Sequence, residues 1–537
     1  MSDVAPLGPT GGPPLPPGKR NLFTRFLDTV EWLGNCLPHP VTLFAVLALA
    51  MVLLSGLFGW LGIAVEDPRP LGAAGRSEDG MIRAVSLMDG DGFRRMFTGL
   101  VGNFTGFAPL GVVLVSMLGI GVAERSGLLS AAVRALVLSA SPKIVTVAIV
   151  FTGVVSNTAS EVGYVVLIPL AGAVYYSLGR HPLAGMAAAF AGVSGGYSAN
   201  LLIGTIDPLL AGITEEAAQL IDPAYQVTAT SSYYFMAVST FLVTIIGALV
   251  SLFIVEPKLG TYDASRADPA VLNTDGAAPL SGKERKGLWM AGLALVAVLG
   301  LMALTLLPEW GVLRDPETGD QLRSPFFSGF AVWILVFFLA VGVAYGRVVG
   351  TVKTDRDVID GMATGLSTLG LYLVIVFFAA QFVAFFNWSN LGAITAVNGA
   401  VFLENTGMTG PAVFIGFIAI CALVNLMIGS ASAQWALTAP IFVPMLMLIG
   451  YSPEVIATAY RIGDSTTNII TPMMSYFGLI LAWATRYDKN VGIGTMIAMM
   501  LPYSIFFTIG WTLLFFAWVF GLGLPVGPGS PTFYTPG

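Results

Sequence analysis

The sequence predicts an all-α polytopic membrane protein, and three observations lead to that fold class. Hydrophobic residues make up 55% of the chain, and the mean hydropathy is +0.81. Only 10% of the residues are charged, whereas soluble domains carry about 25%. Apolar runs of roughly 20 residues, long enough to cross a hydrocarbon core of about 30 Å, recur along the chain. They use nearly all 537 residues, so no stretch remains for a separate water-soluble domain.

Nine full crossings are predicted from these runs. They lie near residues 40–65, 107–125, 182–213, 232–255, 287–307, 326–346, 363–388, 454–484 and 492–520. A polar segment rich in Pro and Gly, 1–39, precedes them and predicts a cytosolic N-terminal tail. Residues 526–537 form a C-terminal tail, and the chain between the two tails, 40–525, makes one transmembrane domain.

Two further apolar stretches, 144–178 and 411–449, are each interrupted by small polar residues. The interruptions are Ser156-Asn-Thr-Ala-Ser160 and Gly429-Ser-Ala-Ser432. Backbone groups left unsatisfied in lipid cost several kcal/mol, so neither interruption is tolerated facing the bilayer. Each stretch therefore predicts a re-entrant hairpin whose tip is buried in protein or lines a wet cavity.

The distribution of cations predicts the orientation. With the nine crossings above and a cytosolic N-terminus, 17 of the 25 Lys and Arg residues fall on the cytosolic side and 7 on the external side. The positive-inside rule favours this arrangement. Because the number of crossings is odd, the C-terminus is then external.

An internal repeat emerges when 161–214 is aligned with 432–485 without gaps, an alignment that we call the repeat register. The matched pairs include Pro169 with Pro440, Gly179 with Gly450, Pro182 with Pro453, and Gly192 with Gly463. Under the predicted topology the two units, about 107–255 and 363–520, enter from opposite sides. An inverted repeat with interrupted helices is typical of secondary transporters, whose site lies between the repeats. The alternative is a duplicated set of helices with only a packing role.

Strongly polar residues lie where a bilayer should exclude them: Asp207, Asn425, Arg461 and Asp464. A charge at that depth costs at least about 2.5 kcal/mol, so such residues usually face a pathway or a partner. Arg461 and Asp464, three residues apart, would be neighbours on a helix and could form an ion pair that only ties helices together. The other interpretation is a helix that breaks near Gly463 and frees carbonyl groups for a ligand.

Oxygen-bearing side chains at the two tips predict cation sites. Ser156, Asn157 and Thr158, with carbonyl groups of 192–200, suit Na⁺, which needs several oxygen donors. The counterpart in the second unit contains Ser430, Ser432, Asp464 and Asn468. Alternatively, these side chains only satisfy hairpin backbones and helix contacts. Trp435, just past the second tip, either stacks on an aromatic substrate or packs inside the protein.

Several function classes are excluded. The two cysteines, Cys36 and Cys421, are far apart, and the two histidines show no HExxH spacing, so neither a disulfide framework nor a metal catalyst is expected. The sequence contains no phosphate-binding loop and no basic stripe with interleaved aromatics, which argues against ATP-driven transport and a nucleic-acid partner. No cofactor is expected beyond Na⁺ or H⁺ as a coupling ion. The apolar spans also lack the nucleophile and base that an intramembrane enzyme would need.

Three motifs resemble those of the AbgT family of p-aminobenzoyl-glutamate transporters. They are Ala191-Gly-Val-Ser-Gly-Gly-Tyr-Ser-Ala-Asn-Leu-Leu-Ile-Gly-Thr-Ile-Asp-Pro208, Gly429-Ser-Ala-Ser-Ala-Gln-Trp-Ala-Leu-Thr-Ala-Pro440 and Tyr460-Arg-Ile-Gly-Asp-Ser-Thr-Thr-Asn-Ile-Ile-Thr-Pro472. The resemblance implies nine spans, two opposed hairpins, and a homodimer in a bacterial inner membrane. It places residues in or near the substrate path at Asp207, Trp435, Pro453, Arg461, Asp464 and Pro472, and it puts Asn425 and Asp464 near a bound sodium ion.

The function that this resemblance implies is uptake of p-aminobenzoyl-glutamate or efflux of sulfonamide antimetabolites, and the sequence does not choose between these directions. The chemistry agrees with such cargo, since an aromatic ring suits Trp435 and two carboxylates suit the planar guanidinium group of Arg461. The alternative within the same class is a sodium-coupled carrier of ordinary dicarboxylates, which has less need of Trp435.

Overall fold

The computed structural model describes residues 39–68, 76–159, 163–263, 279–321 and 324–534. The predicted N-terminal tail, 1–39, lies outside the described residues except for His39, which caps the first described helix. The described chain is mostly helical, as the sequence predicts. Its only strands in this part, β1 (Ala64–Glu66) and β2 (Met81–Arg83), form a small antiparallel hairpin in which Ala64 pairs with Arg83.

Within the described residues, eight helices or helix runs are long and apolar enough to cross a membrane. They are α2 (Pro40–Trp60), α3 (Gly90–Thr105) with α4 (Ala108–Arg125), α10 (Tyr233–Val250) with the π-helical η4 (Ser251–Val255) and α11 (Glu256–Leu259), α13 (Gly282–Leu306), α15 (Phe330–Val349), α17 (Gly370–Trp388), α20 (Ala431–Leu448), and α23 (Ile493–Phe515) with the π-helical η6 (Phe516–Gly521). Seven of these fall on predicted crossings, and α20 lies in the predicted second hairpin.

The other two predicted crossings, 182–213 and 454–484, are each divided. In the first, α8 (Pro182–Phe190) passes through a π-helical turn, η3 (Ala191–Gly195), and helical structure resumes at α9 (Ile206–Ala218). In the second, α21 (Pro453–Asn468) is followed by a non-helical segment and then α22 (Phe477–Tyr487). Proline occupies the first turn of α8 and of α21, where its fixed φ and missing N–H are tolerated.

Two pairs of consecutive helices lie in the stretches predicted to form hairpins. The first pair is α6 (Val145–Ser156), extended by the 3₁₀ turn η1 (Asn157–Ala159), and α7 (Ile168–Ser177), preceded by the π-helical η2 (Gly163–Leu167). The second is α19 (Val413–Met427) and α20, joined by 428–430. We call α6–α9 (145–218) the first unit and α19–α22 (413–487) the second unit.

Helix boundaries in the two units match in the repeat register. The register pairs the first residues of α8 and α21, Pro182 and Pro453, and the first residues of α9 and α22, Ile206 and Phe477. Continued a short way toward the N-terminus, it also pairs the last residues of α6 and α19, Ser156 and Met427. The sequence register thus corresponds to a register of structural elements.

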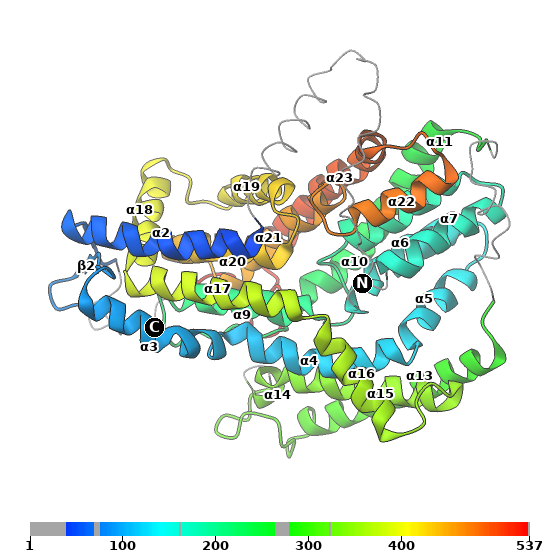
Figure 1. Ribbon diagram of the computed structural model, residues 1–537, viewed down its shortest axis with the longest axis horizontal. Helices are drawn as coiled ribbons and strands as arrows, with labels where there is room; N and C mark the ends of the chain where they lie inside the picture. The colour runs from blue at the N-terminus through cyan, green and yellow to red at the C-terminus, as the bar shows by residue number, and fades with distance from the viewer. Residues whose placement is uncertain (1–38, 69–75, 160–162, 264–278, 322–323, 535–537) are drawn as a thin grey trace, which may run out of the picture.

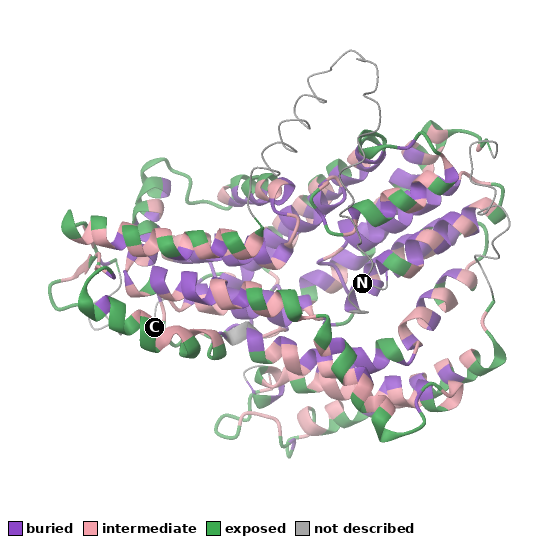
Figure 2. Cartoon of the chain, viewed as in Figure 1, coloured by how far each residue is buried: buried purple, intermediate pink, exposed green. Residues whose placement is uncertain are grey.

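Burial separates the periphery of the molecule from its centre (Figures 1 and 2). Every residue of α8 and of α21 is buried. By contrast, α2 and α13 expose rows of large apolar side chains, such as Leu49 and Leu53 on α2 and Leu293 and Val296 on α13. Exposed apolar rows on long helices suit contact with lipid, so α8 and α21 lie at the protein core and α2 and α13 lie at its periphery.

Shorter helices complete the described part: α5 (Leu128–Leu138), α14 (Pro325–Ser328), α16 (Asp355–Ser367) and α18 (Leu391–Asn405). Helix α18, which packs on α20, lies between the predicted crossing 363–388 and the predicted hairpin 411–449, where no helix was predicted. The C-terminal segment also packs on the protein. Val526 is fully buried, and the Ser452 hydroxyl donates to the Pro531 carbonyl at 2.6 Å, so 526–534 is not a free tail.

Candidate functional site

A cavity of about 350 Å³ lies where the hairpin tips meet the interrupted segments of both units. The two units contribute Asn157, Tyr164, Tyr197, Thr205, Ile206, Leu209, Gly429, Ser430, Ala431, Ser432, Asn468, Met474, Ser475 and Tyr476. Helices α4 and α17 and the junction between α16 and α17 close it with Val113, Met117, Glu124, Thr368, Leu369 and Tyr372. Of the predicted site residues, the cavity wall therefore contains Asn157, Ser430, Ser432 and Asn468.

The second tip touches the interrupted segment of its own unit. A Cβ on Gly429 would lie 2.7 Å from the Met474 backbone nitrogen, so only glycine allows this approach. Next to it, Ser430 caps α20 by accepting a hydrogen bond from the Ala433 amide at 3.4 Å, and its hydroxyl lies 3.5 Å from that of Ser432. The start of α20 thus presents polar groups and a helix N-terminus to the cavity.

In the first unit, the tip side chains bond to the interrupted segment. The Asn157 amide donates to the Gly196 carbonyl at 3.2 Å, and the Thr158 hydroxyl donates to Asn200 Oδ1 at 2.8 Å. The Ser156 hydroxyl bonds locally, to the Gly153 carbonyl. Asn157 Oδ1 is buried and accepts no hydrogen bond from the described residues. One acceptor thus remains available at the edge of the cavity.

In the second unit, Asn425 connects α19 to the C-terminal end of α21. Its amide nitrogen lies 2.7 Å from the Asp464 carbonyl, 2.9 Å from the Thr467 hydroxyl and 2.8 Å from Asn468 Oδ1. Its own Oδ1 is buried and accepts nothing from the described part of the chain. The hydrogen bonds from Nδ2 therefore fix the orientation of the Asn425 amide group, and its Oδ1 remains available to a ligand.

Asp464 is fully buried, and neither of its carboxyl oxygens accepts a hydrogen bond from the described residues. Its polar neighbours bond elsewhere, since the Tyr460 hydroxyl donates to the Ala431 carbonyl and Asn468 accepts from Asn425. A buried carboxylate is costly unless a cation or a proton compensates it. The oxygens of Asp464 and Asn425 are the hard donors that Na⁺ prefers, so these residues fit a small cation.

Arg461 does not pair with Asp464, which corrects the ion pair considered from the sequence spacing. Its Nη1 donates to Asp207 Oδ1 at 2.7 Å, and the two side chains are 5% and 2% exposed. The second Asp207 oxygen accepts from the Gly204 amide at 2.9 Å. The spacing allowed a local pair, but the Arg461 side chain extends across to α9. This ion pair joins the second unit to the first.

The expected helix break at Gly463 is also wrong. Helix α21 runs unbroken to Asn468, so the break follows it instead, between α21 and α22. Gly463 serves close packing, because a Cβ there would lie 2.6 Å from the Ile418 carbonyl oxygen on α19. The carbonyl groups of 463–467 are consequently inside a helix.

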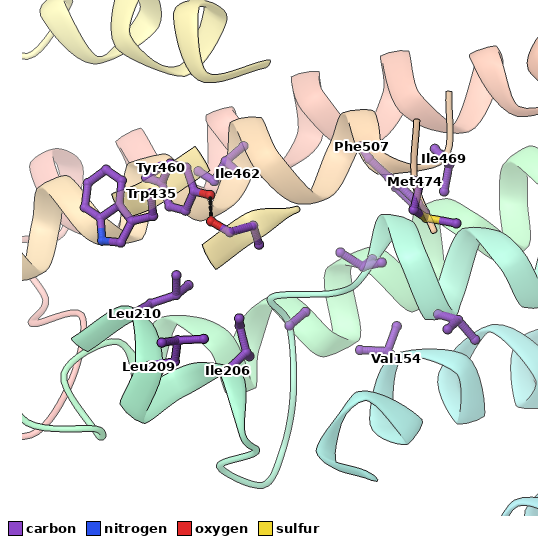
Figure 3. Packing of buried hydrophobic residues seen from close by; sticks show 14 of the residues in the cluster. Val154, Ile206, Leu209, Leu210, Trp435, Tyr460, Ile462, Ile469, Met474 and Phe507 are labelled. Atoms are coloured by element: carbon purple, nitrogen blue, oxygen red, sulfur yellow. Dashed lines mark hydrogen bonds between the residues drawn. The ribbon is translucent and has the colours of Figure 1, made fainter. Parts of the chain in front are cut away.

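Trp435 is fully buried against protein (Figure 3). Its ring stacks on Tyr460 with centroids 4.2 Å apart, and its Nε1 donates to the Thr214 hydroxyl at 2.9 Å. It does not belong to the described cavity wall, nor do Asp207, Pro453, Arg461, Asp464 or Pro472. Pro453 begins α21, and Pro472 lies half-buried in the segment before α22.

Two aromatic residues of the cavity wall that stack on each other were not among the predicted site residues. The rings of Tyr164 and Tyr476 stack with centroids 4.5 Å apart and an interplanar angle of 10°, and both line the cavity. A signal for Tyr164 was present in the repeat register, which aligns it with Trp435. No comparable signal marks Tyr476, which the register pairs with Thr205.

The family profile of the AbgT transporters matches residues 25–534. The chain belongs to the AbgT transporter family. It is 35% identical over 500 residues to the p-aminobenzoyl-glutamate transport protein of Escherichia coli K12, covering 93% of this chain and 95% of that protein. The AbgT membership predicted from the three motifs is confirmed.

Two solved structures of similar transporters agree with this family membership. MtrF of Neisseria gonorrhoeae, described with a class of antimetabolite efflux pumps, is 58% identical, with a TM-score of 0.89 over 94% of this chain and 100% of that one. The YdaH transporter of Alcanivorax borkumensis is 47% identical, with a TM-score of 0.84 over 91% and 100% of the two chains. These relatives are transporters or efflux pumps, so this AbgT member is a multi-pass membrane transporter and not an enzyme.

Proposed function

We propose that this AbgT member is a secondary active transporter of p-aminobenzoyl-glutamate and related aromatic folate metabolites, or of sulfonamide antimetabolites, coupled to a Na⁺ or proton gradient. The observation that carries the proposal is the fully buried, unbonded carboxyl group of Asp464. It lies on the same helix as Asn468, which lines the cavity and bonds to Asn425. A buried carboxyl group whose oxygens accept no hydrogen bond from the described residues suits a site that takes up and releases a cation.

The architecture we propose around this site is an inverted repeat with two re-entrant hairpins among nine crossings. The matching boundaries of α6 and α19, α8 and α21, and α9 and α22 support it. Secondary transporters built in this way carry substrate and ions at the interface of the repeats. The Lys and Arg distribution supports a cytosolic N-terminus and an external C-terminus in a bacterial inner membrane, and the family resemblance supports a homodimer.

For the coupling ion, the proposed Na⁺ ligands in the second unit are Asn425, Asp464 and Asn468, with Ser430 and Ser432 nearby on the cavity wall. In the first unit they are Ser156, Asn157 and Thr158, of which Asn157 supplies a free buried oxygen. A proton on Asp464 is the alternative, since protonation also removes the cost of burying the charge.

For the cargo, the glutamyl carboxylates of p-aminobenzoyl-glutamate suit the N-terminus of α20, where Ser430 and Ser432 face the cavity. Arg461 is already paired with Asp207, so binding a carboxylate there requires that pair to open. An ordinary dicarboxylate would use the same helix terminus. The aromatic cargo is favoured by the curated relative's substrate and by the two tyrosine rings on the cavity wall.

The test is uptake into proteoliposomes that contain the purified full chain. Labelled p-aminobenzoyl-glutamate and labelled succinate are compared under an imposed Na⁺ gradient, an imposed proton gradient, and no gradient. We expect accumulation of p-aminobenzoyl-glutamate above equilibrium under one of the gradients and little accumulation of succinate. Equilibration without accumulation would indicate a channel, and stronger accumulation of succinate would establish the dicarboxylate carrier.

A further inference from the structure

The structure assigns recognition of the substrate's aromatic ring to Tyr164 and Tyr476 rather than to Trp435. We infer that Tyr164 is a stacking platform and that Tyr476 is a removable cover, so that the cargo's ring replaces the Tyr476 ring on the face of Tyr164. This inference deepens the proposed function and rests on it.

Access is the first argument. Both tyrosines line the cavity that also contains the tip residues Asn157, Ser430 and Ser432. Trp435 is absent from that wall, and one face of its ring is occupied by Tyr460 while its indole N–H is satisfied by Thr214. Trp435 can bind a ring only if a buried stack and a buried hydrogen bond break, whereas Tyr164 already lies on the cavity wall.

Geometry is the second argument. The nearly parallel rings, 10° apart in plane with centroids at 4.5 Å, leave no room for a third ring between them. A flat benzoyl ring therefore binds only by taking one tyrosine's place. The exchange replaces one aromatic stack by another, so it sacrifices little of the stacking energy.

The surroundings of the two rings differ, and they decide which one moves. Tyr164 is 5% exposed and lies in the helical stretch η2, which packs on α5, α6, α7 and α8. Tyr476 is only half-buried, and it directly precedes α22 at the end of the non-helical segment that follows α21. A half-buried side chain on irregular backbone is the easier of the two to displace.

The stack also joins the two units, since Tyr164 belongs to the first and Tyr476 to the second. When the cargo's ring displaces Tyr476, this contact between the units is lost. Binding of an aromatic cargo would therefore release one of the contacts that hold the units together, which a non-aromatic dicarboxylate would not do.

The experiment measures uptake into proteoliposomes by wild type and by Tyr164→Leu, Tyr164→Phe and Tyr476→Leu. The substrates are p-aminobenzoyl-glutamate and cyclohexanecarbonyl-glutamate, which has a saturated ring of similar size. In wild type we expect the aromatic substrate to have the lower KM by roughly 2- to 13-fold, the range of one aromatic pair. Tyr164→Leu should bring that ratio to about 1, and Tyr164→Phe should retain it.

The Tyr476→Leu variant is expected to change the KM in the opposite direction. Removing the competing ring in Tyr476→Leu should lower the KM for the aromatic substrate, whereas a merely structural stack would raise it in both leucine variants. Phe386→Leu, which breaks the stacked pair Phe382–Phe386 on α17 away from the cavity, is the matched control and should leave the ratio unchanged. If Tyr164→Leu does not fold, the direction of the Tyr476→Leu effect decides.

The outcomes separate the inference from the proposed function. If wild type accumulates p-aminobenzoyl-glutamate but Tyr164→Leu keeps the preference for the aromatic ring, or Tyr476→Leu raises its KM, the tyrosine assignment is overturned and the transporter proposal stands. If wild type accumulates neither glutamate conjugate under any gradient, the proposed function is overturned and the assignment with it.

Discussion

The two units share helix boundaries but differ in the chemistry at their centres. The repeat register places Val154 opposite Asn425 and Val193 opposite Asp464. All four side chains are fully buried. The first unit thus fills with aliphatic groups the positions where the second unit holds an amide and a carboxyl group whose oxygens accept no hydrogen bond from the described residues.

This difference shows that the fold does not need polar groups there. Valine at these positions packs without loss, while an unpaired carboxylate is one of the costliest groups to bury. Its presence in only one unit indicates a ligand that binds asymmetrically, and it makes the second unit the stronger candidate for the coupling ion. The first unit contributes the amide of Asn157 and the ring of Tyr164 to the cavity wall.

The largest effect is expected from making the second unit resemble the first. Asp464→Val should abolish gradient-driven accumulation, because the site loses the carboxyl group that would hold the cation, while thermal stability is unchanged or higher, because no described hydrogen bond is lost. The reverse change, Val193→Asp, should destabilise the protein by several kcal/mol, since it buries a carboxyl group without a partner. Uptake assays and thermal unfolding in detergent measure the two. Normal accumulation by Asp464→Val would remove the functional asymmetry between the units.

A second large effect concerns the ion pair that joins the units. Arg461→Leu or Asp207→Leu alone should cost about 3–5 kcal/mol, since each leaves a buried charge unpaired, whereas the double change should recover most of that stability. The exposed pair Arg125–Asp360, 46% and 45% exposed, is the control and should contribute no more than about 1 kcal/mol. Unfolding of the four single variants and two double variants tests this.

The same variants separate stability from function. If the pair acts only as a link between the units, the double leucine variant should transport at equal membrane abundance. If Arg461 must release Asp207 to bind a carboxylate, the variant should fold but not transport. Equal instability of the single and double variants would contradict the described pairing.

A smaller difference is expected between two buried amide side chains, Asn425 on α19 and Asn157 at the first tip. Asn425→Ala removes close contacts to Asp464, Thr467 and Asn468 and should cost about 2–3 kcal/mol, whereas Asn157→Ala removes one bond, to Gly196, and should cost about 1 kcal/mol. Thermal unfolding gives both values. If Asn157→Ala lost as much stability as Asn425→Ala, or more, the hydrogen-bond networks of the two amides would not differ as described.

Much of the fold followed from the sequence because hydropathy and helix-breaking residues act locally. The long apolar runs predicted seven of the eight described helices or helix runs that are long and apolar enough to cross a membrane, and both polar interruptions coincide with helix ends. The repeat register predicted the shared helix starts at Pro182 and Pro453. It could not predict that the helix containing Gly463 continues, because a glycine that permits close packing and one that ends a helix are alike in sequence.

The site was predicted less completely because its contacts are long-range. Asp207 is 254 residues from Arg461, and nothing in the spacing of either distinguishes this partner from the nearer Asp464. Likewise, the composition around Trp435 does not show that its ring stacks on Tyr460 or that its indole N–H donates to Thr214. The tip residues Asn157, Ser430 and Ser432 line the cavity, which agrees with the expectation that a backbone interruption at membrane depth is buried in protein or faces a wet cavity.

The smallest effect should come from the two tip serines, and it sharpens the comparison at the level of single hydrogen bonds. Ser430 caps α20, an 18-residue helix, so Ser430→Ala should cost about 1 kcal/mol by leaving the Ala433 amide without its acceptor. Ser156 donates only to the Gly153 carbonyl, one turn earlier in its own helix. Because Ser156→Ala leaves the backbone hydrogen bonds of that helix intact, we expect it to lower the stability by about 0.5 kcal/mol or less. Unfolding midpoints measured side by side, with Ser139→Ala on the exposed end of α5 as the control, should therefore rank Ser430 above Ser156. The opposite ranking would mean that the first tip, not the second, depends on its serine, and that α20 needs no side-chain cap where it meets the cavity.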